Sequence, residues 1–290
     1  MVKLGSLEAG GTKFVLAISD ENFNILDQTQ FQTETADFTV QKTIDYFKEN
    51  PVDALSIGSF GPIDICKDSP TYGYITTTPK AGWANVDLLG KIKSVLEIPV
   101  YFTTDVNSSA YGESIMTAET SLLYFTIGTG IGAGAIQEGK FIGGVAHAEM
   151  GHQFVQIHPE DLAFKGVCPF HGNCLEGMAS GPSLKARLGI SGEDIPKNHK
   201  IWDIQAYYIA QAAVNGCLSL SPAKIVLGGG VMAQKHMIER VREQFVSLLN
   251  GYVTLPCPIE DYLITTRVEN NGSASLGNFA LAKQLLKNKN

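Results

Sequence analysis

Two similar α/β halves are expected from three features of this sequence. Helical spacing of apolar residues alternates along the chain with short runs that are typical of buried strands. A pattern of strand, Gly/Thr turn and strand occurs over 7–18 and again over 125–136, an offset of 125 − 7 = 118 residues. With 290 residues, 44% of them hydrophobic, the chain is long enough for about two domains. We therefore expect a duplicated α/β fold whose two Gly/Thr turns face one another across a ligand-binding cleft.

The first half contains two helix and strand pairs. Apolar residues three or four apart over 40–47 predict a helix, and 54–58 reads as a short buried strand. Residues 88–96 predict a second helix, and 100–104 predicts a β-rich strand. The same alternation returns in the second half, which has a helix over 201–220 and, further on, an amphipathic helix ending at Gly251.

The domain boundary has to come from this pattern, because no Pro-, Ser- or charge-rich linker separates the halves. We expect an N-terminal domain over 1–107, with the first Gly/Thr turn and a candidate catalytic Asp. The C-terminal domain is expected over 108–290, with its last helix a candidate to pack back on the first domain.

The charge balance disfavours some function classes. The chain has 22 Lys and Arg against 29 Asp and Glu, a formal charge of −7, so its average surface repels nucleic-acid phosphates and anionic lipids. Residues 120–137 carry no charge, but their Gly and Thr content is typical of strand and turn. Lys3 and Glu8 leave no room for a secretory signal core. We expect a cytoplasmic protein without nucleic-acid or membrane partners.

Three glycine-rich turns are candidate phosphate-binding sites. Gly10-Gly11-Thr12-Lys13 and Gly128-Thr129-Gly130 lie in the two predicted hairpins, and Gly228-Gly229-Gly230 follows a predicted strand at 223–227. Without Cβ atoms, backbone N–H groups can approach an anion closely, and Thr hydroxyls add donors. One such turn alone is more often a plain tight hairpin, but three together favour a polyphosphate.

Two better-known nucleotide motifs match only in part. Residues 134–140 fit G-x-x-x-x-G-K, but Phe141 stands where a Walker loop needs a hydroxyl for Mg²⁺. Gly128-x-Gly130-x-x-Ala133 fits a dinucleotide fingerprint, yet the residues that follow are poor helix formers. A nicotinamide-dependent oxidoreductase is therefore disfavoured.

A cluster of Cys and His residues predicts a metal site. Its members are His152, Cys168, His171 and Cys174. Thiolate and imidazole ligands at such close spacing suit the tetrahedral preference of Zn²⁺, and four of them leave no position open for water, which predicts a structural site. His147 and His158 are alternatives to His152, and a chance Cys/His-rich loop is the competing explanation.

Three acidic residues are candidates for the chemistry. Asp105 follows a predicted strand and begins a predicted helix, where α/β folds present groups to a ligand. Glu149 and Glu176 flank the predicted zinc loop and could bind sugar hydroxyls through charge-assisted hydrogen bonds. Each has a plainer explanation, a helix N-cap for Asp105 and solvated side chains for the two glutamates.

Eight short motifs follow one another in a specific order and spacing. They are Glu8-Ala-Gly-Gly-Thr-Lys13, Gly58-Ser-Phe-Gly-Pro-Ile63, Tyr72-Gly-Tyr-Ile-Thr-Thr-Thr-Pro-Lys80, Thr104-Asp-Val-Asn107, Thr126-Ile-Gly-Thr-Gly-Ile131, Glu149-Met-Gly-His152, Cys168 to Glu176, and Leu227-Gly-Gly-Gly-Val-Met232. Together they resemble, nearly from end to end, the ROK sugar kinases, and within that family the bacterial fructokinase branch.

The resemblance implies an actin-like (ribonuclease H-like) fold of two α/β domains around a cleft. It implies that Asp105 is the catalytic base and binds the sugar with Glu149, His152 and Glu176. The positions that match nucleotide contacts are Gly10, Gly11, Thr12, Lys13, Thr129, Gly130, Pro182, Gly228, Gly229, Gly230, Val231 and Met232. The positions that match zinc ligands are His152, Cys168, His171 and Cys174.

Two positions depart from the common pattern of the family. Glu8 stands where most members have Asp, which gives a longer reach toward any Mg²⁺. Thr104 replaces a common Asn before the catalytic Asp, which removes an amide that could bind a sugar hydroxyl. In the zinc loop, His171 replaces a Cys, a change that imidazole chemistry tolerates.

The resemblance therefore implies an enzyme that phosphorylates D-fructose at O6 with ATP and Mg²⁺, holds a structural zinc and forms a homodimer. A kinase for mannose or glucose, and a non-catalytic zinc-stabilised sugar-binding protein, stay open as alternatives. A repressor of the same family needs a DNA-binding helix-turn-helix before the first Gly/Thr turn, and only seven residues precede Glu8. We accordingly expect the enzyme rather than the repressor.

Overall fold

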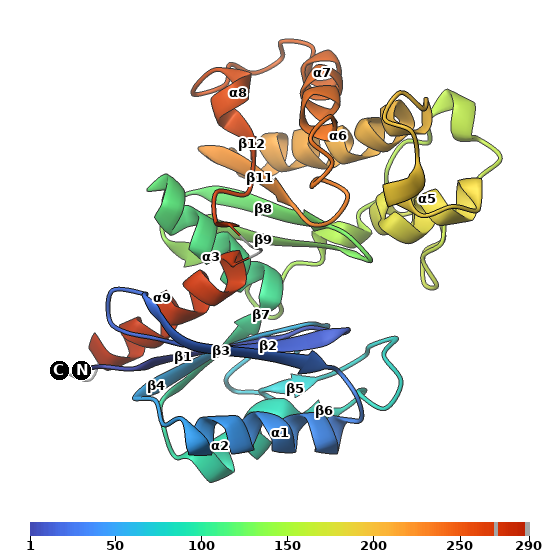
Figure 1. Ribbon diagram of the computed structural model, residues 1–290. Coiled ribbons are helices and arrows are strands. Elements are labelled where there is room, and N and C mark those ends of the chain that lie inside the picture. Colours follow the sequence, from blue (N-terminus) through green and yellow to red (C-terminus); the bar gives the residue numbers. More distant parts are fainter. Residues whose placement is uncertain (270–271, 288–290) are drawn as a thin grey trace. The chain divides into compact units, whose positions relative to one another are not determined.

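Two five-stranded sheets organise the chain in the computed structural model, which describes residues 1–269 and 272–287 (Figure 1). The residues around the first sheet, here called unit 1, are Met1–Met116, Ile142–His147 and Val268–Asn290. Those around the second sheet, here called unit 2, are Thr117–Phe141 and Ala148–Arg267. The boundary predicted after residue 107 falls inside a helix, and as a division into folding domains it stays a prediction.

Unit 1 contains seven strands and four helices among its described residues. They are β1 (Leu4–Ala9), β2 (Lys13–Ser19), β3 (Ile25–Gln32), α1 (Ala36–Glu49), β4 (Ala54–Ser59), β5 (Tyr74–Ile75), β6 (Val86–Asp87), α2 (Leu88–Leu96), β7 (Val100–Thr104), α3 (Asp105–Thr117) and α9 (Ser273–Lys287). The helices and strands predicted over 40–47, 54–58, 88–96 and 100–104 are confirmed.

The sheet of unit 1 has the order β3-β2-β1-β4-β7, with β1, β4 and β7 parallel to one another. Side chains alternate between its faces, as they must along a strand. Leu7 and Leu55 pack with α1 and α2, whereas Leu4 and Ala54 pack against Phe279 of α9. The sheet therefore lies between two helical layers, with α1 and α2 on one face and α9 on the other (Figure 1).

Unit 2 repeats this plan with a second set of elements. They are β8 (Leu122–Ile127), β9 (Ile131–Gln137), β10 (Lys140–Phe141), the short 3₁₀ helices η1 (Met150–His152), η2 (Pro159–Asp161) and η3 (Gly192–Asp194), α4 (Leu175–Ala179), α5 (Gly181–Leu188), α6 (Ile201–Leu220), β11 (Lys224–Gly228), α7 (Met237–Leu249), α8 (Ile259–Tyr262) and β12 (Leu263–Thr265).

The order of the second sheet, β10-β9-β8-β11-β12, matches that of the first strand for strand. β1 pairs antiparallel with β2 and parallel with β4. In the same way, β8 pairs antiparallel with β9 and parallel with β11. The duplication predicted from the two Gly/Thr turns is thus confirmed. The uncharged run over 120–137 forms β8, the turn and β9, as predicted.

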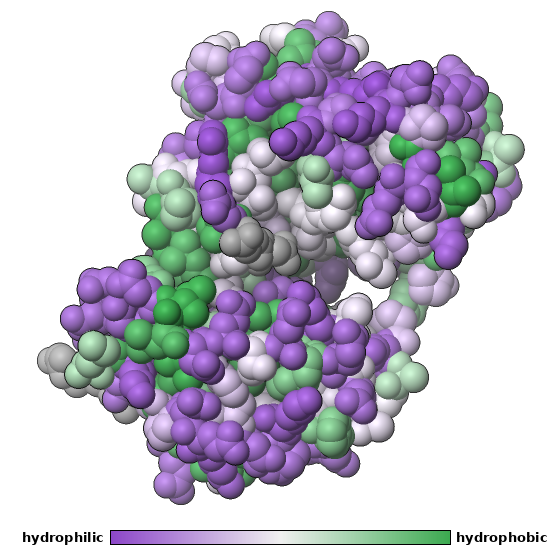
Figure 2. Space-filling model, viewed as in Figure 1, coloured by the Kyte–Doolittle hydropathy of each residue, from purple (hydrophilic) through white to green (hydrophobic). Residues whose placement is uncertain are grey.

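The surface fits this two-sheet architecture. Hydrophilic residues cover most of the face visible in Figure 2, with smaller apolar areas between them. Within residues 1–269 and 272–287, none of the helices combines the length and the apolar character that crossing a bilayer requires.

Candidate functional site

The first Gly/Thr turn joins β1 to β2 in unit 1, as predicted. The N–H of Gly10 donates to the carbonyl of Lys13 (3.0 Å), and the Thr33 hydroxyl donates to the carbonyl of Gly10 (2.6 Å). A Cβ at Gly10 would lie 2.7 Å from the Lys13 carbonyl oxygen, so the turn needs glycine there. Thr12 and Lys13 are exposed, while Gly11 is half-buried, so the turn presents backbone and side-chain donors to solvent.

Asp105 lies at the same edge of the sheet as this turn. It is the first residue after β7, and β1, β4 and β7 run parallel, so their carboxyl ends meet at one edge. A Cβ at Gly58, near the end of β4, would lie 3.2 Å from Cα of Asp105, which shows how closely the strand approaches α3. This edge is where open α/β sheets bind their ligands.

Thr104, and not Asp105, supplies the capping hydrogen bond of α3. The Thr104 hydroxyl accepts from the N–H of Asn107 (3.1 Å), three residues further on, which is the N-cap geometry. Oδ1 of Asp105 accepts instead from the N–H of its neighbour Val106 (2.9 Å). The plainer explanation of Asp105 as a helix cap therefore does not account for it. Thr104, the departure noted in the sequence, has a structural role of its own.

Glu8 precedes the first turn by two residues and pairs with Gly58 across β1 and β4. Burial raises the pKa of the Glu8 carboxyl above its ordinary value, and the nearby positive charge of Lys13 partly opposes that shift. A cation bound at this edge would favour the ionised carboxylate in the same way.

The second Gly/Thr turn joins β8 to β9 in unit 2. The N–H of Gly128 donates to the carbonyl of Gly130 (2.9 Å), and the N–H of Gly181, at the start of α5, donates to the carbonyl of Gly128 (2.7 Å). The N–H of Ile131 donates to Oε2 of Glu176 (2.9 Å). Glu176, predicted as a sugar ligand, thus also holds this turn, a role that the sequence reasoning missed.

A pocket of 670 Å³ opens beside the second turn, a volume typical of small-molecule sites. Four of the predicted nucleotide-contacting residues line it, namely Thr129, Pro182, Gly230 and Val231. The polar or aromatic lining residues that the sequence reasoning missed are Lys185, Ser191, Glu193, Trp202 and Gln234. They come from α5, from η3 and the residue before it, from α6 and from the loop before α7, so only the folded chain brings them together.

The other predicted nucleotide residues of unit 2 shape the turns without lining this pocket. Gly229 has a positive φ of 87°, and a Cβ there would lie 2.5 Å from the carbonyl oxygen of Ile127. A Cβ at Gly228 would lie 2.7 Å from the Tyr124 hydroxyl, and Met232 is buried. Gly130 lies against Glu176, because a Cβ there would be 2.8 Å from Oε2. Gly229 is therefore required by close backbone approach and Gly228 by the Tyr124 side chain, whereas a Cβ at Gly230 would meet no atom within 4 Å.

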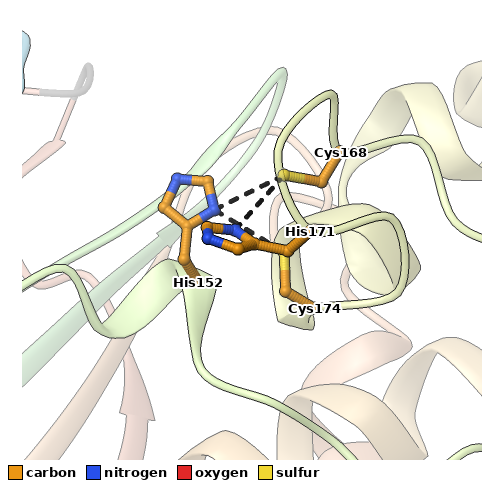
Figure 3. Close-up of side chains that lie close together, drawn as sticks. All are labelled: His152, Cys168, His171 and Cys174. Atoms are coloured by element: carbon orange, nitrogen blue, oxygen red, sulfur yellow. Dashed lines mark hydrogen bonds between the residues drawn. The ribbon is translucent and has the colours of Figure 1, made fainter. Parts of the chain in front are cut away.

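The four predicted metal ligands converge in unit 2, as Figure 3 shows. Their ligand atoms all lie within 4.8 Å of one another. Sγ of Cys168 is 3.7 Å from Nδ1 of His152 and 3.7 Å from Nδ1 of His171. Sγ of Cys174 is 3.6 Å from Nδ1 of His152.

These spacings fit a tetrahedral metal. Bond lengths of about 2.3 Å to sulfur and about 2.05 Å to nitrogen, at the tetrahedral angle, put S and N about 3.6 Å apart. Burial raises the pKa of the Cys174 thiol to about 11, which favours the neutral thiol. A bound cation would oppose this shift and favour the thiolate form. The alternative ligands lie elsewhere: Nε2 of His147 accepts from the N–H of Ile63 (3.0 Å), and Nδ1 of His158 accepts from the N–H of Glu160 (3.2 Å).

The loop that carries these ligands also carries the predicted sugar-binding carboxylates. Glu149 is exposed and directly precedes η1, whose His152 donates its N–H to the Glu149 carbonyl (3.0 Å). Glu176 lies two residues after Cys174, in the first turn of α4. A metal bound by His152 and Cys174 would therefore fix the backbone next to both carboxylates.

Comparisons with known proteins agree with this architecture. Residues 4–285 match the model of the ROK family. A fructokinase from Lactococcus lactis subsp. cremoris is 59% identical over 284 residues, which cover 98% of both proteins. A fructokinase from Streptococcus mutans is 59% identical over 286 residues, which cover 97% of both.

Among solved structures, the ROK hexokinase from Thermus thermophilus superposes with a TM-score of 0.80 at 22% identity, over 99% of this chain and 100% of that one. A likeness at this identity shows the fold. The expected actin-like α/β fold, with one sheet of the same strand order in each unit, is therefore confirmed.

Proposed function

We propose that this chain, which belongs to the ROK family, is a fructokinase that transfers the γ-phosphoryl group of ATP to O6 of D-fructose. One observation carries the catalytic part of the proposal: Asp105 and the Gly10–Lys13 turn lie at the edge where the parallel strands β1, β4 and β7 of one sheet end. The choice of fructose rests on the two fructokinases that share 59% of their residues with this chain.

Asp105 serves as the general base. Its carboxylate accepts the proton of the sugar hydroxyl and orients the oxygen in line with the phosphoryl group. Because a phosphoryl-transfer transition state has little covalent chemistry for a protein to perform, positioning and charge stabilisation supply most of the acceleration. The capping bond from Thr104 supports this role, since the N-cap hydrogen bond to the Asn107 N–H does not come from Asp105.

The nucleotide is bound by backbone donors and by the pocket of unit 2. The Gly10–Lys13 turn offers N–H groups and the Lys13 ammonium to phosphate oxygens. The pocket beside Thr129 and Pro182, 670 Å³ in volume, takes the nucleoside. Mg²⁺ arrives with ATP as part of the substrate and neutralises phosphate charge.

Fructose is held by Glu149, His152 and Glu176, which the metal loop carries. Carboxylates bind sugar hydroxyls through charge-assisted hydrogen bonds. Nδ1 of His152 faces the two cysteine sulfurs, which leaves Nε2 on the far side of the ring for a sugar hydroxyl. Zinc, held by His152, Cys168, His171 and Cys174, supplies a structural cross-link rather than chemistry on phosphate.

The experiment that tests this function measures ADP release from MgATP with fructose, glucose, mannose, glucosamine or N-acetylmannosamine. We expect fructose to give the highest kcat/KM of the five sugars, and ³¹P NMR of the product to identify it as the 6-phosphate. If mannose or glucose gives the highest value, the kinase stands and the fructose assignment falls. If no sugar supports turnover in zinc-replete protein, the chain is the non-catalytic sugar-binding protein instead.

The resemblance also leads us to propose a cytoplasmic homodimer. Sedimentation velocity tests the assembly, because a dimer has twice the 31.2 kDa mass of one chain. A single species at the monomer mass over the whole accessible concentration range contradicts the dimer.

A further inference from the structure

The side chain of Asn278, on α9, is fully buried and uses its whole hydrogen-bonding capacity. Its Oδ1 accepts from the hydroxyls of Ser56 (3.0 Å) and Ser108 (2.7 Å). Its Nδ2 donates to the Ser6 hydroxyl (3.1 Å) and to the Leu7 carbonyl (3.1 Å). A carboxamide has two acceptor sites and two N–H donors, so none is left over. Because a carbonyl can only accept, the Leu7 contact fixes which way the amide faces.

These four bonds join the elements that carry the phosphate turn and the base. Two of the bonded groups lie on β1, directly before the Gly10–Lys13 turn. Ser56 lies on the neighbouring strand β4. Ser108 lies in the first turn of α3, three residues after Asp105. One side chain therefore connects the strand that leads into the phosphate turn with the helix that begins at the base.

The backbones of α3 and α9 are in contact next to this amide. A Cβ at Gly277 would lie 1.8 Å from the carbonyl oxygen of Ser108, and a Cβ at Gly112 would lie 2.0 Å from that of Ser273. No side chain can separate the helices at this crossing. A shift of α3 along α9 would therefore either produce a clash or stretch the bond between Ser108 and Asn278.

The Ser108 hydroxyl has a local alternative that it does not use. A serine inside a helix commonly donates to the carbonyl four residues earlier, as the neighbouring Ser109 does to Asp105 (3.0 Å). The Ser108 hydroxyl turns instead to Asn278, and Gly58 leaves the space for it, since a Cβ at Gly58 would lie 2.5 Å from Oγ. The residues around α3 thus favour the long-range bond over the local one.

We propose that Asn278 is a positioning residue, which sets the place of α3 against β1 and so the distance between Asp105 and the phosphate turn. The inference rests on the proposed role of Asp105 as the base. Phosphoryl transfer is sensitive to such placement, because a misplacement of about 1 Å can cost about 100-fold in rate. Asn278 acts through Asp105 and touches neither substrate.

Two serine variants provide a matched test. Ser108→Ala and Ser56→Ala each remove one hydroxyl from the same oxygen of Asn278, and both serines are fully buried. We expect similar losses of thermal stability in the two variants. Only Ser108→Ala removes the bond between α3 and Asn278, so its kcat falls about 10-fold or more while the kcat of Ser56→Ala stays near that of wild type. KM for fructose changes little in either variant.

The dependence on Asp105 is measured with a double-mutant cycle. In an Asp105→Asn background, Ser108→Ala lowers kcat much less than it does in wild type, because both changes act on one group. Asn278→Asp is the second variant: it keeps both serine bonds but places an acceptor against the Leu7 carbonyl, and its kcat falls as well.

The outcomes separate this inference from the proposed function. Equal kcat in Ser56→Ala and Ser108→Ala, or additive effects of Ser108→Ala and Asp105→Asn, would overturn the positioning role. Undiminished turnover in Asp105→Asn alone would overturn the assignment of the base instead.

Discussion

Replacing Arg187 by Met should destabilise the protein strongly, because its guanidinium is buried and makes four hydrogen bonds. Nε and Nη2 of Arg187 donate to the two carboxylate oxygens of Asp161 (3.1 and 2.7 Å), a bidentate pair. The guanidinium also donates to the Ser183 hydroxyl (2.9 Å) and the Met178 carbonyl (2.9 Å), and it stacks on the Phe164 ring at 3.8 Å. The pair joins α5, which lines the 670 Å³ pocket of unit 2, to the end of η2.

The magnitude follows from burial. The side chains of Arg187 and Asp161 are 6% and 7% exposed, so removing the cation leaves a carboxylate that is largely shielded from water. Breaking such a buried pair costs about 3–5 kcal/mol. At about 2–4 °C per kcal/mol for a domain of this size, Tm falls by about 6–20 °C. Thermal unfolding followed by circular dichroism measures it.

A control and a double variant sharpen the test. Lys200→Met removes one partner of an exposed ion pair with Glu160, 76% and 61% exposed, and should cost less than about 1 kcal/mol. Adding Asp161→Asn to Arg187→Met removes the unpaired charge, so the double variant should be more stable than Arg187→Met alone. A loss below about 1 kcal/mol in Arg187→Met, or a double variant less stable than the single one, refutes this reasoning.

The remaining predictions concern the metal, the turns and pH. Purified protein should contain about one zinc per chain by elemental analysis, and Cys168→Ser with Cys174→Ser should lose both the zinc and thermal stability; unchanged stability without zinc contradicts its structural role. Glu176→Ala should raise KM for ATP about 10-fold, because it removes the acceptor for the Ile131 N–H, whereas Glu176→Gln keeps that acceptor and should change KM for ATP little. Burial raises the folded-state pKa of Glu8, so its ionisation costs stability as pH rises from the unfolded-state pKa through the folded-state pKa. Between about pH 4.5 and 7, wild type should therefore lose more unfolding free energy than Glu8→Gln does in chemical denaturation, and identical pH dependence contradicts the burial of this carboxyl.

Local patterns predicted much of this molecule. The Cys/His cluster could be predicted because three of its four residues lie within a stretch of seven, and their chemistry favours zinc among the ions they could bind. The two hairpins could be found because Gly and Thr residues interrupt runs of strand formers. Asp105 could be placed because a strand ends and a helix begins at that point.

Contacts between distant residues could not be predicted in this way. Asn278 bonds to groups on β1 that lie 271 and 272 residues earlier, and nothing near it in sequence marks those partners. The bond from the Ile131 N–H to Glu176 spans 45 residues. Hydrophobic periodicity determines which face of an element is buried, but it does not determine which polar group lies opposite.

Helix boundaries show a different limit. Thr104 and Asp105 are both good N-cap residues, and sequence patterns place helix ends only to within one or two positions. The structure resolves the choice, because the Asn107 N–H donates to Thr104. That one-residue distinction assigns the N-cap hydrogen bond to Thr104, while Oδ1 of the Asp105 carboxylate accepts from the neighbouring Val106 N–H.

The chemical step with Asp105→Asn tests the central claim most directly. Rapid mixing of enzyme with MgATP and fructose, followed by acid quench, measures formation of fructose 6-phosphate in a single turnover. Asp105→Asn should form it at least about 100-fold more slowly than wild type, with thermal stability and nucleotide affinity unchanged. A single-turnover rate close to that of wild type would contradict the assignment of Asp105 as the base.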